Sequence, residues 1–177
     1  MNLDELRNDC AIKQKKGLHI ILASVLIWIA VLCVHLTKFP ILTKNLLTFC
    51  CTAPLMPLSF LISKIIKVDF QNKSNPLNKL GLLFSANQML YLLIAMWVYP
   101  TVPEKMLMVI SMIFGAHLMP YSWLYKSKSY FILSIIIPIV SLIIGLKFDT
   151  YILALTMLIF EVLFSILLIT EVKSLEK

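Results

Sequence analysis

The sequence predicts an all-α protein, a polytopic membrane bundle of six transmembrane helices with both ends of the chain in the cytoplasm. Of its 177 residues, 60% are hydrophobic and only 14% are charged, whereas about a quarter of the residues in a soluble domain are charged. Mean hydropathy is +0.91, and the apolar residues form continuous runs, which excludes the alternating pattern of membrane β-strands. This composition also excludes a secreted disulfide scaffold, a disordered tail, a nucleic-acid-binding domain and an ordinary cytosolic enzyme.

Six apolar runs approach or exceed the roughly 20 residues that a helix needs to cross the hydrocarbon core. They are the segments 17–36, 43–66, 78–99, 104–125, 130–146 and 150–170. Prolines occur at four of the predicted boundaries, where a missing backbone N–H does no harm: Pro40, Pro76, Pro100 and Pro103. We therefore predict one transmembrane domain over residues 17–170, preceded by a cytoplasmic segment 1–16 and followed by a cytoplasmic tail 171–177.

The N-terminal segment 1–16 is polar, with Leu3, Leu6 and Cys10 at helical spacing. A short helix in the membrane interface and a frayed polar tail both fit this pattern. The alternatives stay open at this point.

Basic residues predict the orientation of the bundle. If the N-terminus is cytoplasmic, 12 of the 16 Lys and Arg residues lie on the cytoplasmic side, namely Arg7, Lys13, Lys15, Lys16, Lys64, Lys67, Lys73, Lys79, Lys126, Lys128, Lys173 and Lys177. The other side then holds only Lys38, Lys44, Lys105 and Lys147. Cytoplasmic loops carry an excess of positive charge, so both termini are predicted inside. The expected partners of these cations are anionic lipid headgroups, not nucleic acid.

Four predicted helices carry side chains that suit an interface or a close helix contact. Aromatic residues near the ends of spans are typical of a belt at the membrane surface: Trp97, Trp123, Tyr99, Tyr125 and Tyr130. His19 and His35 lie at the two ends of the first span and are expected at the interface. Because no G-x-x-x-G motif occurs, Ala and Ser are expected to provide close helix approach.

Polar residues near the middle of three spans form the candidate site. Glu161 is the only acidic residue well inside a span, and His117 lies at a similar depth by the rise of about 1.5 Å per residue. Asn87 and Gln88 occupy the corresponding level of the third span. A charge at the bilayer centre costs roughly 2.5–3.5 kcal/mol, so such residues need partners or a function.

Two tyrosines extend this polar layer along their own helices. Tyr91 follows Asn87 by four residues and Gln88 by three, and Tyr121 follows His117 by four. The functional interpretation is a polar cavity that binds a small solute or relays a proton, with Glu161 as the titrating group. The structural alternative is a set of interhelical hydrogen bonds, each worth about 0.6–2 kcal/mol, that fix the bundle.

Motifs for metal binding, cofactor binding and catalysis are absent from the sequence. The four cysteines, Cys10, Cys33, Cys50 and Cys51, have no metal-ligand spacing. Neither a P-loop nor a G-x-S-x-G nucleophile motif occurs, and the chain has only four glycines. We therefore expect no metal, no cofactor and no enzymatic activity.

A short sequence recurs in the second and fourth spans. Segments 55–61 (LMPLSFL) and 118–124 (LMPYSWL) are identical at five of seven positions. Coincidence and common ancestry are both compatible with so short a match. In either case Pro57 and Pro120 each leave a carbonyl unpaired one turn earlier. Two interpretations stay open: kinks that open a cavity on the cytoplasmic half of the bundle, and kinks that are tolerated for packing, since proline is frequent in membrane helices.

Residues 75–130, together with LLTFCC at 46–51 and KVDFQNKSNP at 67–76, resemble a family of small bacterial six-helix membrane proteins with no assigned activity. The resemblance covers most of the chain. It implies a bacterial inner-membrane protein and supplies no substrate and no site residues.

Three functions are compared as explanations of this sequence. A protein that binds or transports a solute or protons requires an accessible cavity at the polar layer. A sensor or accessory subunit, which binds a partner membrane protein or a second copy of the chain, predicts a sealed bundle with its polar layer internally satisfied. A lipid-acting enzyme needs a convergent nucleophile, base and oxyanion site, for which the sequence offers no candidates.

Overall fold

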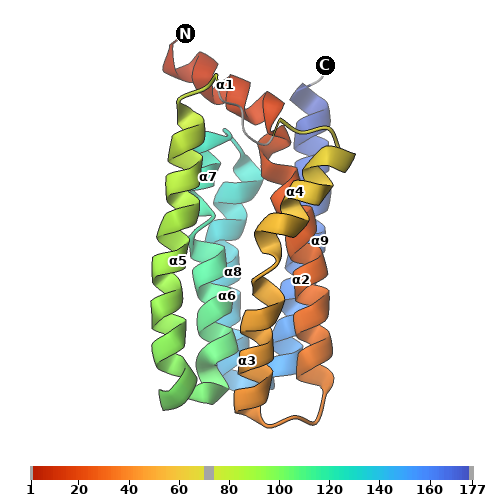
Figure 1. The fold of residues 1–177 in the computed structure, drawn as a ribbon, viewed down its shortest axis with the longest axis vertical. Coiled ribbons are helices and arrows are strands. Elements are labelled where there is room, and N and C mark those ends of the chain that lie inside the picture. The colour runs from red at the N-terminus through yellow and green to blue at the C-terminus, as the bar shows by residue number, and fades with distance from the viewer. Residues whose placement is uncertain (1, 70–73, 176–177) are drawn as a thin grey trace.

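The computed structural model describes residues 2–69 and 74–175. All six predicted spans are helical, and they run along the long axis of the bundle (Figure 1). By length and composition, six helices of the described part are able to cross a membrane: Lys15–Leu36, Ile41–Ile65, Leu77–Thr101, Pro103–Leu124, Lys128–Lys147 and Thr150–Leu175. The last helix continues past the predicted limit at residue 170. Lys73 and Lys177, which belong to the predicted cytoplasmic set, lie outside the described residues.

Two of the six spans are interrupted. The elements are α1 Leu3–Lys13, η1 Lys15–Gly17, α2 Leu18–Leu36, α3 Ile41–Thr52, α4 Leu55–Ile65, α5 Leu77–Thr101, η2 Pro103–Lys105, α6 Met106–Ala116, α7 Met119–Leu124, α8 Lys128–Lys147 and α9 Thr150–Leu175. The second span is thus built from α3 and α4, and the fourth from η2, α6 and α7. Figure 1 shows both ends of the chain at the same end of the bundle, as six crossings require.

Helix α1 lies across that end of the bundle, which favours a folded helix over a frayed tail (Figure 1). Its start is stabilised by a capping box, in which Asn2 and Glu5 satisfy each other's backbone N–H groups. Arg7 donates to the carbonyl of Trp123 over 2.6 and 2.9 Å, and its guanidinium lies 4.6 Å from the Trp123 ring centre. The thiol of Cys10 is fully buried beneath the helix, and burial, aided by the charge of Asp9, raises its pKa to about 11. Cys10 therefore remains protonated and packs as a small apolar residue.

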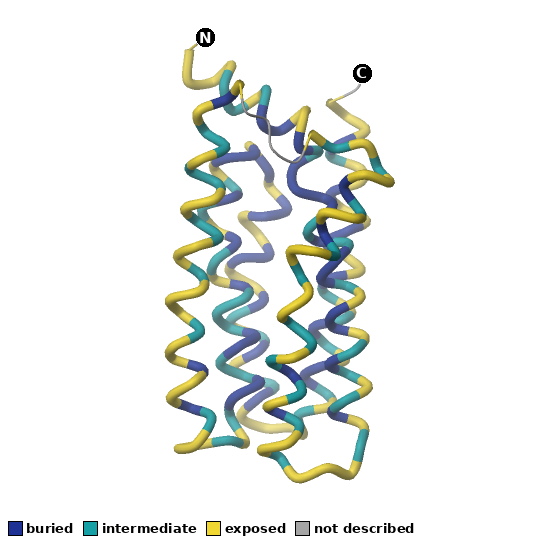
Figure 2. Tube along the Cα trace, in the orientation of Figure 1, coloured by how far each residue is buried: buried dark blue, intermediate teal, exposed yellow. Residues whose placement is uncertain are grey.

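The core runs along the middle of the bundle, mainly between α2, α6, α8 and α9. Helix α9 packs along α2, and α6 packs along α8. Phe164, Met157 and Leu168 of α9 are among the fully buried side chains of this core. In contrast, α5 is exposed along most of its length, as Figure 2 shows. Helix α5 therefore stands at the edge of the bundle, where it forms one side wall.

Two glycines allow α6 and α8 to pack closely, although the sequence predicts only Ala and Ser at such close helix contacts. A Cβ added at Gly115 of α6 would lie 2.6 Å from the Pro138 ring and 2.7 Å from Ile137 of α8. A Cβ at Gly145 would lie 2.5 Å from Met108 in the same helix pair. Ala23, Ala154 and several serines are also buried. The prediction that Ala and Ser provide the close helix contacts is therefore incomplete, because it leaves out glycine.

Four of the residues expected at the membrane interface turn toward the interior of the bundle. Tyr125 and Tyr130 are buried, whereas Trp97 and Trp123 are exposed as a belt requires. His35 is also buried, because its Nδ1 and Nε2 lie 2.9 and 3.1 Å from the hydroxyls of Thr150 and Thr48 and so join three helices. His19 is buried as well.

Candidate functional site

The two interrupted spans break at the recurring sequence motif. Helix α3 ends at Thr52 and α4 begins at Leu55, while α6 ends at Ala116 and α7 begins at Met119. Each break lies about one turn before the proline of its motif, Pro57 or Pro120, where the proline has no N–H to continue the helical ladder. The predicted kinks are therefore present as two-residue interruptions, at 53–54 and at 117–118.

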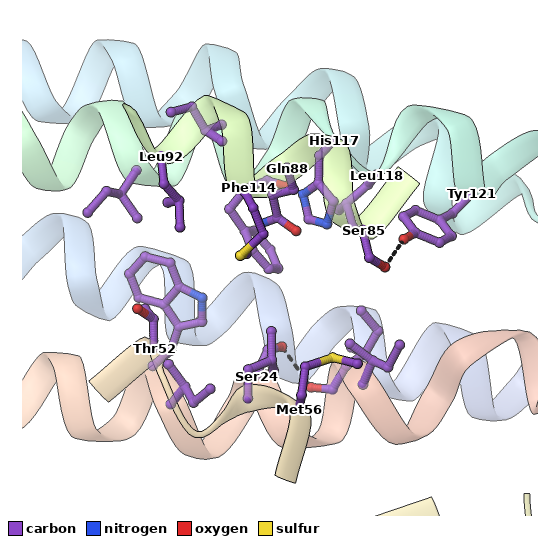
Figure 3. Close-up of a pocket in the computed structure, with 18 of the residues that line it drawn as sticks. Ser24, Thr52, Met56, Ser85, Gln88, Leu92, Phe114, His117, Leu118 and Tyr121 are labelled. Carbon is purple, nitrogen blue, oxygen red and sulfur yellow. Dashed lines mark hydrogen bonds between the residues drawn. The ribbon is translucent and has the colours of Figure 1, made fainter. Parts of the chain in front are cut away.

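A cavity of about 410 Å³ lies between these two broken spans. Its walls come from α2, from the junction of α3 and α4, from α5, and from the junction of α6 and α7. Figure 3 shows Ser24, Thr52 and Met56 on one side and Gln88, His117 and Tyr121 on the other. The cavity lies within the range of about 300–1,000 Å³ that is usual for small-molecule sites.

An aromatic wall extends along the cavity. Trp28 of α2 meets Phe114 of α6 edge to face, with ring centres 6.2 Å apart. His117 follows, 5.4 Å from Phe114 and 6.0 Å from Tyr121. Tyr121 then stacks on Tyr125 at 6.0 Å. Flat rings of this kind offer a large apolar surface with polar edges, which suits a bound organic molecule.

Two polar groups on the cavity wall have no hydrogen-bond partner among the described residues. The amide of Gln88 makes no side-chain hydrogen bond there, although it lines the cavity and is half-buried. His117 uses Nδ1 to donate to the carbonyl of Phe114, which leaves Nε2 as an acceptor in the neutral ring. The sequence prediction placed both residues in one layer, and the structure brings both to the same cavity.

Tyr121 closes part of the same wall through its hydroxyl. It lies 2.6 Å from the Ser85 hydroxyl and donates to the Gly81 carbonyl over 3.1 Å, which links α7 to α5. Tyr121 therefore has a structural tie and also contributes ring surface to the cavity.

Glu161 lies behind the cavity, on α9, and is completely buried. Its carboxyl group contacts the hydroxyl of Ser24, a residue of the cavity wall, while its Oε1 has no partner in the described part of the chain. The Ser24 hydroxyl also lies 2.8 Å from the Ile21 carbonyl. Since a hydroxyl has one proton, Ser24 donates either to Ile21 or to Glu161, and in the first case Glu161 must itself donate as a carboxylic acid.

Asn87 and Tyr91 lie away from the cavity. Both side chains are exposed on the outer surface of α5, where Asn87 donates to the Tyr91 hydroxyl over 2.8 Å. Helical spacing correctly pairs these two residues with each other. It does not predict which face of α5 turns inward, and the structure gives that role to Gln88.

A polar cluster at the end of the bundle, which sequence reasoning missed, lies next to two tyrosines of the cavity wall. Lys16 and Glu171 form an ion pair of 2.7 Å, and Glu171 also accepts from the backbone N–H and hydroxyl of Ser129 over 3.0 and 2.6 Å. We call Gln14, Lys16, Ser129 and Glu171 the end cluster. The sequence gives one signal, the acid Glu171 just after the last predicted span, and the predicted boundary at residue 170 places it in the cytoplasmic tail.

Two cavity tyrosines connect to the end cluster. Tyr125 donates to Gln14 Oε1 over 2.8 Å, and Tyr130 donates to the Lys16 carbonyl over 3.0 Å. Burial raises the pKa of Tyr125 well above its usual value, so the hydroxyl keeps the proton that it donates. The cavity is thus bounded at this end by side chains held in place by residues 14–16.

Within residues 2–69 and 74–175, no group of three or more His, Cys, Asp or Glu side chains is arranged to hold a metal ion. At the cavity, the polar groups are neutral hydrogen-bonding groups, with the Glu161 carboxyl behind Ser24.

Comparison with known proteins gives one match. No curated protein and no solved structure matches the chain. Residues 3–171 match the model of a family described as "Family of unknown function (DUF7010)". Because this match spans nearly the whole six-helix bundle, the chain belongs to the DUF7010 family.

Proposed function

We propose that this protein binds a small solute in the cavity between its two broken spans and transports it across the membrane. The observation that carries the proposal is that two polar groups, the Gln88 amide and His117 Nε2, face one cavity without a hydrogen-bond partner in the part of the chain that the structure describes. A polar group in the bilayer core without a partner costs free energy, because hydrocarbon supplies no hydrogen bonds. A bound solute or water satisfies both groups.

The broken helices support the same proposal. Helices interrupted at mid-membrane expose backbone groups toward a binding site in many transporters. Here the two breaks face each other across the cavity, and the side chains beside them, Thr52 and His117, line it. A bundle whose polar layer served only for packing would satisfy its own polar groups internally.

Access to the cavity is tested by introducing a cysteine into a background from which the four native cysteines have been removed. In membrane vesicles, we expect Gln88→Cys to react with N-ethylmaleimide at least about tenfold faster than Asn87→Cys, because alkylation requires a hydrated thiolate. The two positions are adjacent in sequence but lie inside and outside the cavity.

A second substitution identifies the cavity as the cause of that reactivity. Thr52→Phe adds bulk to the cavity wall and is expected to slow the reaction of Gln88→Cys, whereas Thr43→Phe on the exposed face of α3 is not. Equal, low reactivity at positions 87 and 88 would contradict the proposal. It would favour a sealed bundle that acts as a sensor or an accessory subunit.

Glu161 is the proposed proton-binding residue of the transport cycle. No cation pairs with it among the described residues, and a buried unpaired carboxylate is strongly disfavoured, so the acid form that donates to Ser24 is the resting state. We expect an infrared band of a protonated carboxylic acid at neutral pH, absent in Glu161→Gln and retained in Glu104→Gln, whose acid is exposed. A spectrum unchanged by Glu161→Gln would remove this residue from the proposal.

The proposed setting is a bacterial inner membrane with both termini in the cytoplasm. The excess of Lys and Arg at the end of the bundle that holds α1 supports this orientation, and these cations are proposed to contact anionic headgroups. Fusions of alkaline phosphatase to the loop around residue 75 are expected to be inactive and those to residue 148 active; the reverse pattern would invert the topology. The proposed activity involves no catalysis, and self-association or a partner membrane protein is compatible with it.

A further inference from the structure

The walls of the cavity carry no formal charge. Within the described residues, its lining contains no Asp, Glu, Lys or Arg. Most lining groups are aliphatic or aromatic, and the remainder are hydroxyls, the Gln88 amide and the His117 ring. A charged solute would lose its hydration here without gaining an opposite charge, at a cost that strongly disfavours binding.

The cavity also reaches the side of the bundle. Met56 of α4 and Leu82 and Met89 of α5 line the cavity and are 46%, 65% and 57% exposed, so the cavity is open beside them. All three lie within membrane-spanning segments, so the medium that they meet is lipid acyl chain. The opening between α4 and α5 therefore faces the bilayer, and flexible methionine side chains flank it.

Two tyrosines with fixed hydroxyls line the end of the cavity near the chain termini. Tyr125 and Tyr130 fill that end, and their hydroxyls are held by Gln14 and by the Lys16 carbonyl. Gly17 packs directly against them, since a Cβ there would lie 2.9 Å from the Tyr130 hydroxyl and 3.2 Å from the Tyr125 ring. Among the described residues, these tied tyrosines therefore stand between the cavity and this end of the bundle, whereas the exposed residues Met56, Leu82 and Met89 mark the opening toward the bilayer.

From these three features we infer that the ligand is an uncharged, lipid-soluble amphiphile that enters sideways from the bilayer between α4 and α5. Its hydrogen-bonding group meets Gln88 and His117 Nε2, and its apolar body lies against the aromatic wall formed by Trp28 and Phe114. This inference rests on the proposed binding function, and it adds the chemical class of the ligand and its route.

Trp28 is a built-in reporter of this ligand, because it lines the cavity and is buried, whereas Trp97 is exposed on α5. With Trp28 as the sole tryptophan, the protein in phosphatidylcholine vesicles is titrated with two nitroxide quenchers that share one ring. One is the neutral 4-hydroxy derivative and the other is the cationic trimethylammonium derivative. We expect the neutral nitroxide to quench Trp28 saturably and at least about tenfold more effectively than the cation, because charge is excluded from hydrocarbon.

Two further arms test the route and the site. Phosphatidylcholine carrying a nitroxide in mid-chain is expected to quench Trp28 more than phosphatidylcholine carrying it on the headgroup. Thr52→Phe is expected to reduce quenching of Trp28 by the neutral nitroxide, and Thr43→Phe is not. A protein with Trp97 alone gives the unsaturable quenching of a lipid-facing residue, unaffected by either substitution.

The outcomes separate the two proposals. Equal quenching of Trp28 by both nitroxides, with a reactive cysteine in Gln88→Cys, would overturn the uncharged class while leaving solute binding in place. Stronger quenching from the headgroup position than from mid-chain would overturn the sideways route. Absence of saturable quenching by either nitroxide, together with an unreactive cysteine, would overturn both proposals.

Discussion

Glu171→Ala is expected to destabilise the protein by about 3 kcal/mol, since removing one partner of a buried ion pair leaves the other charge unpaired. The Lys16 and Glu171 side chains are only 7% and 20% exposed. The substitution removes the acceptor of three hydrogen bonds, one from Lys16 and two from Ser129. The measurement is the midpoint of SDS-induced unfolding in detergent micelles, followed by circular dichroism.

A second ion pair at the same end of the bundle provides the control. Lys126 and Asp4 lie 3.1 Å apart with side chains 37% and 69% exposed. Asp4→Ala is expected to change stability by less than about 1 kcal/mol, because solvent screens exposed pairs. Equal effects of Glu171→Ala and Asp4→Ala would show that the end cluster does not hold η1 and α9 together.

Gly115→Val is expected to destabilise the bundle by about 3 kcal/mol, the upper part of the range for overpacking. The first added carbon would already lie 2.6 Å from the Pro138 ring and 2.7 Å from Ile137. Neither neighbour yields easily, since proline is a closed ring and isoleucine is stiff at its branched carbon. Helices α6 and α8 would have to separate, which is detected as a lower thermal midpoint and faster proteolysis in micelles.

Gly81→Ala is the matched control on α5. Its added carbon would meet only the terminal methyl of Leu124, at 3.2 Å, and that side chain can rotate. The better helix propensity of alanine, about 1 kcal/mol, offsets the contact. A large loss in Gly81→Ala, or none in Gly115→Val, would contradict the close packing of α6 on α8.

The number and placement of spans could be predicted from the sequence because the bilayer imposes one length on every crossing. The breaks in the second and fourth spans were also predictable, since Pro57 and Pro120 act locally through a missing N–H. These signals do not predict how each helix is rotated about its own axis, and therefore which of its faces turns inward. Asn87 and Gln88 are neighbours with similar chemistry, and only packing against α6 and α7 decides that Gln88 meets the cavity.

The site was predictable in part for the same reason. Glu161 and His117 stand out because polar residues are rare at that depth, and both lie at or beside the cavity. Ser24, the partner of Glu161, has no such signal, because serine is common in membrane helices. Lys16 resembles every other flanking lysine, so its ion pair with Glu171 emerges only from the fold.

The pairing of Lys16 with Glu171 has a consequence for biosynthesis. The two residues are separated by 155 positions. Lys16 is therefore synthesised long before Glu171, and it has no ion-pair partner from the last helix until nearly the entire chain has left the ribosome. Until α9 inserts, the tyrosines at positions 125 and 130 meet an N-terminal segment without that anchor. The tyrosine-lined end of the cavity is therefore completed among the last events of assembly. Nascent chains that stall before the last helix inserts would expose this incomplete end to chaperones and proteases.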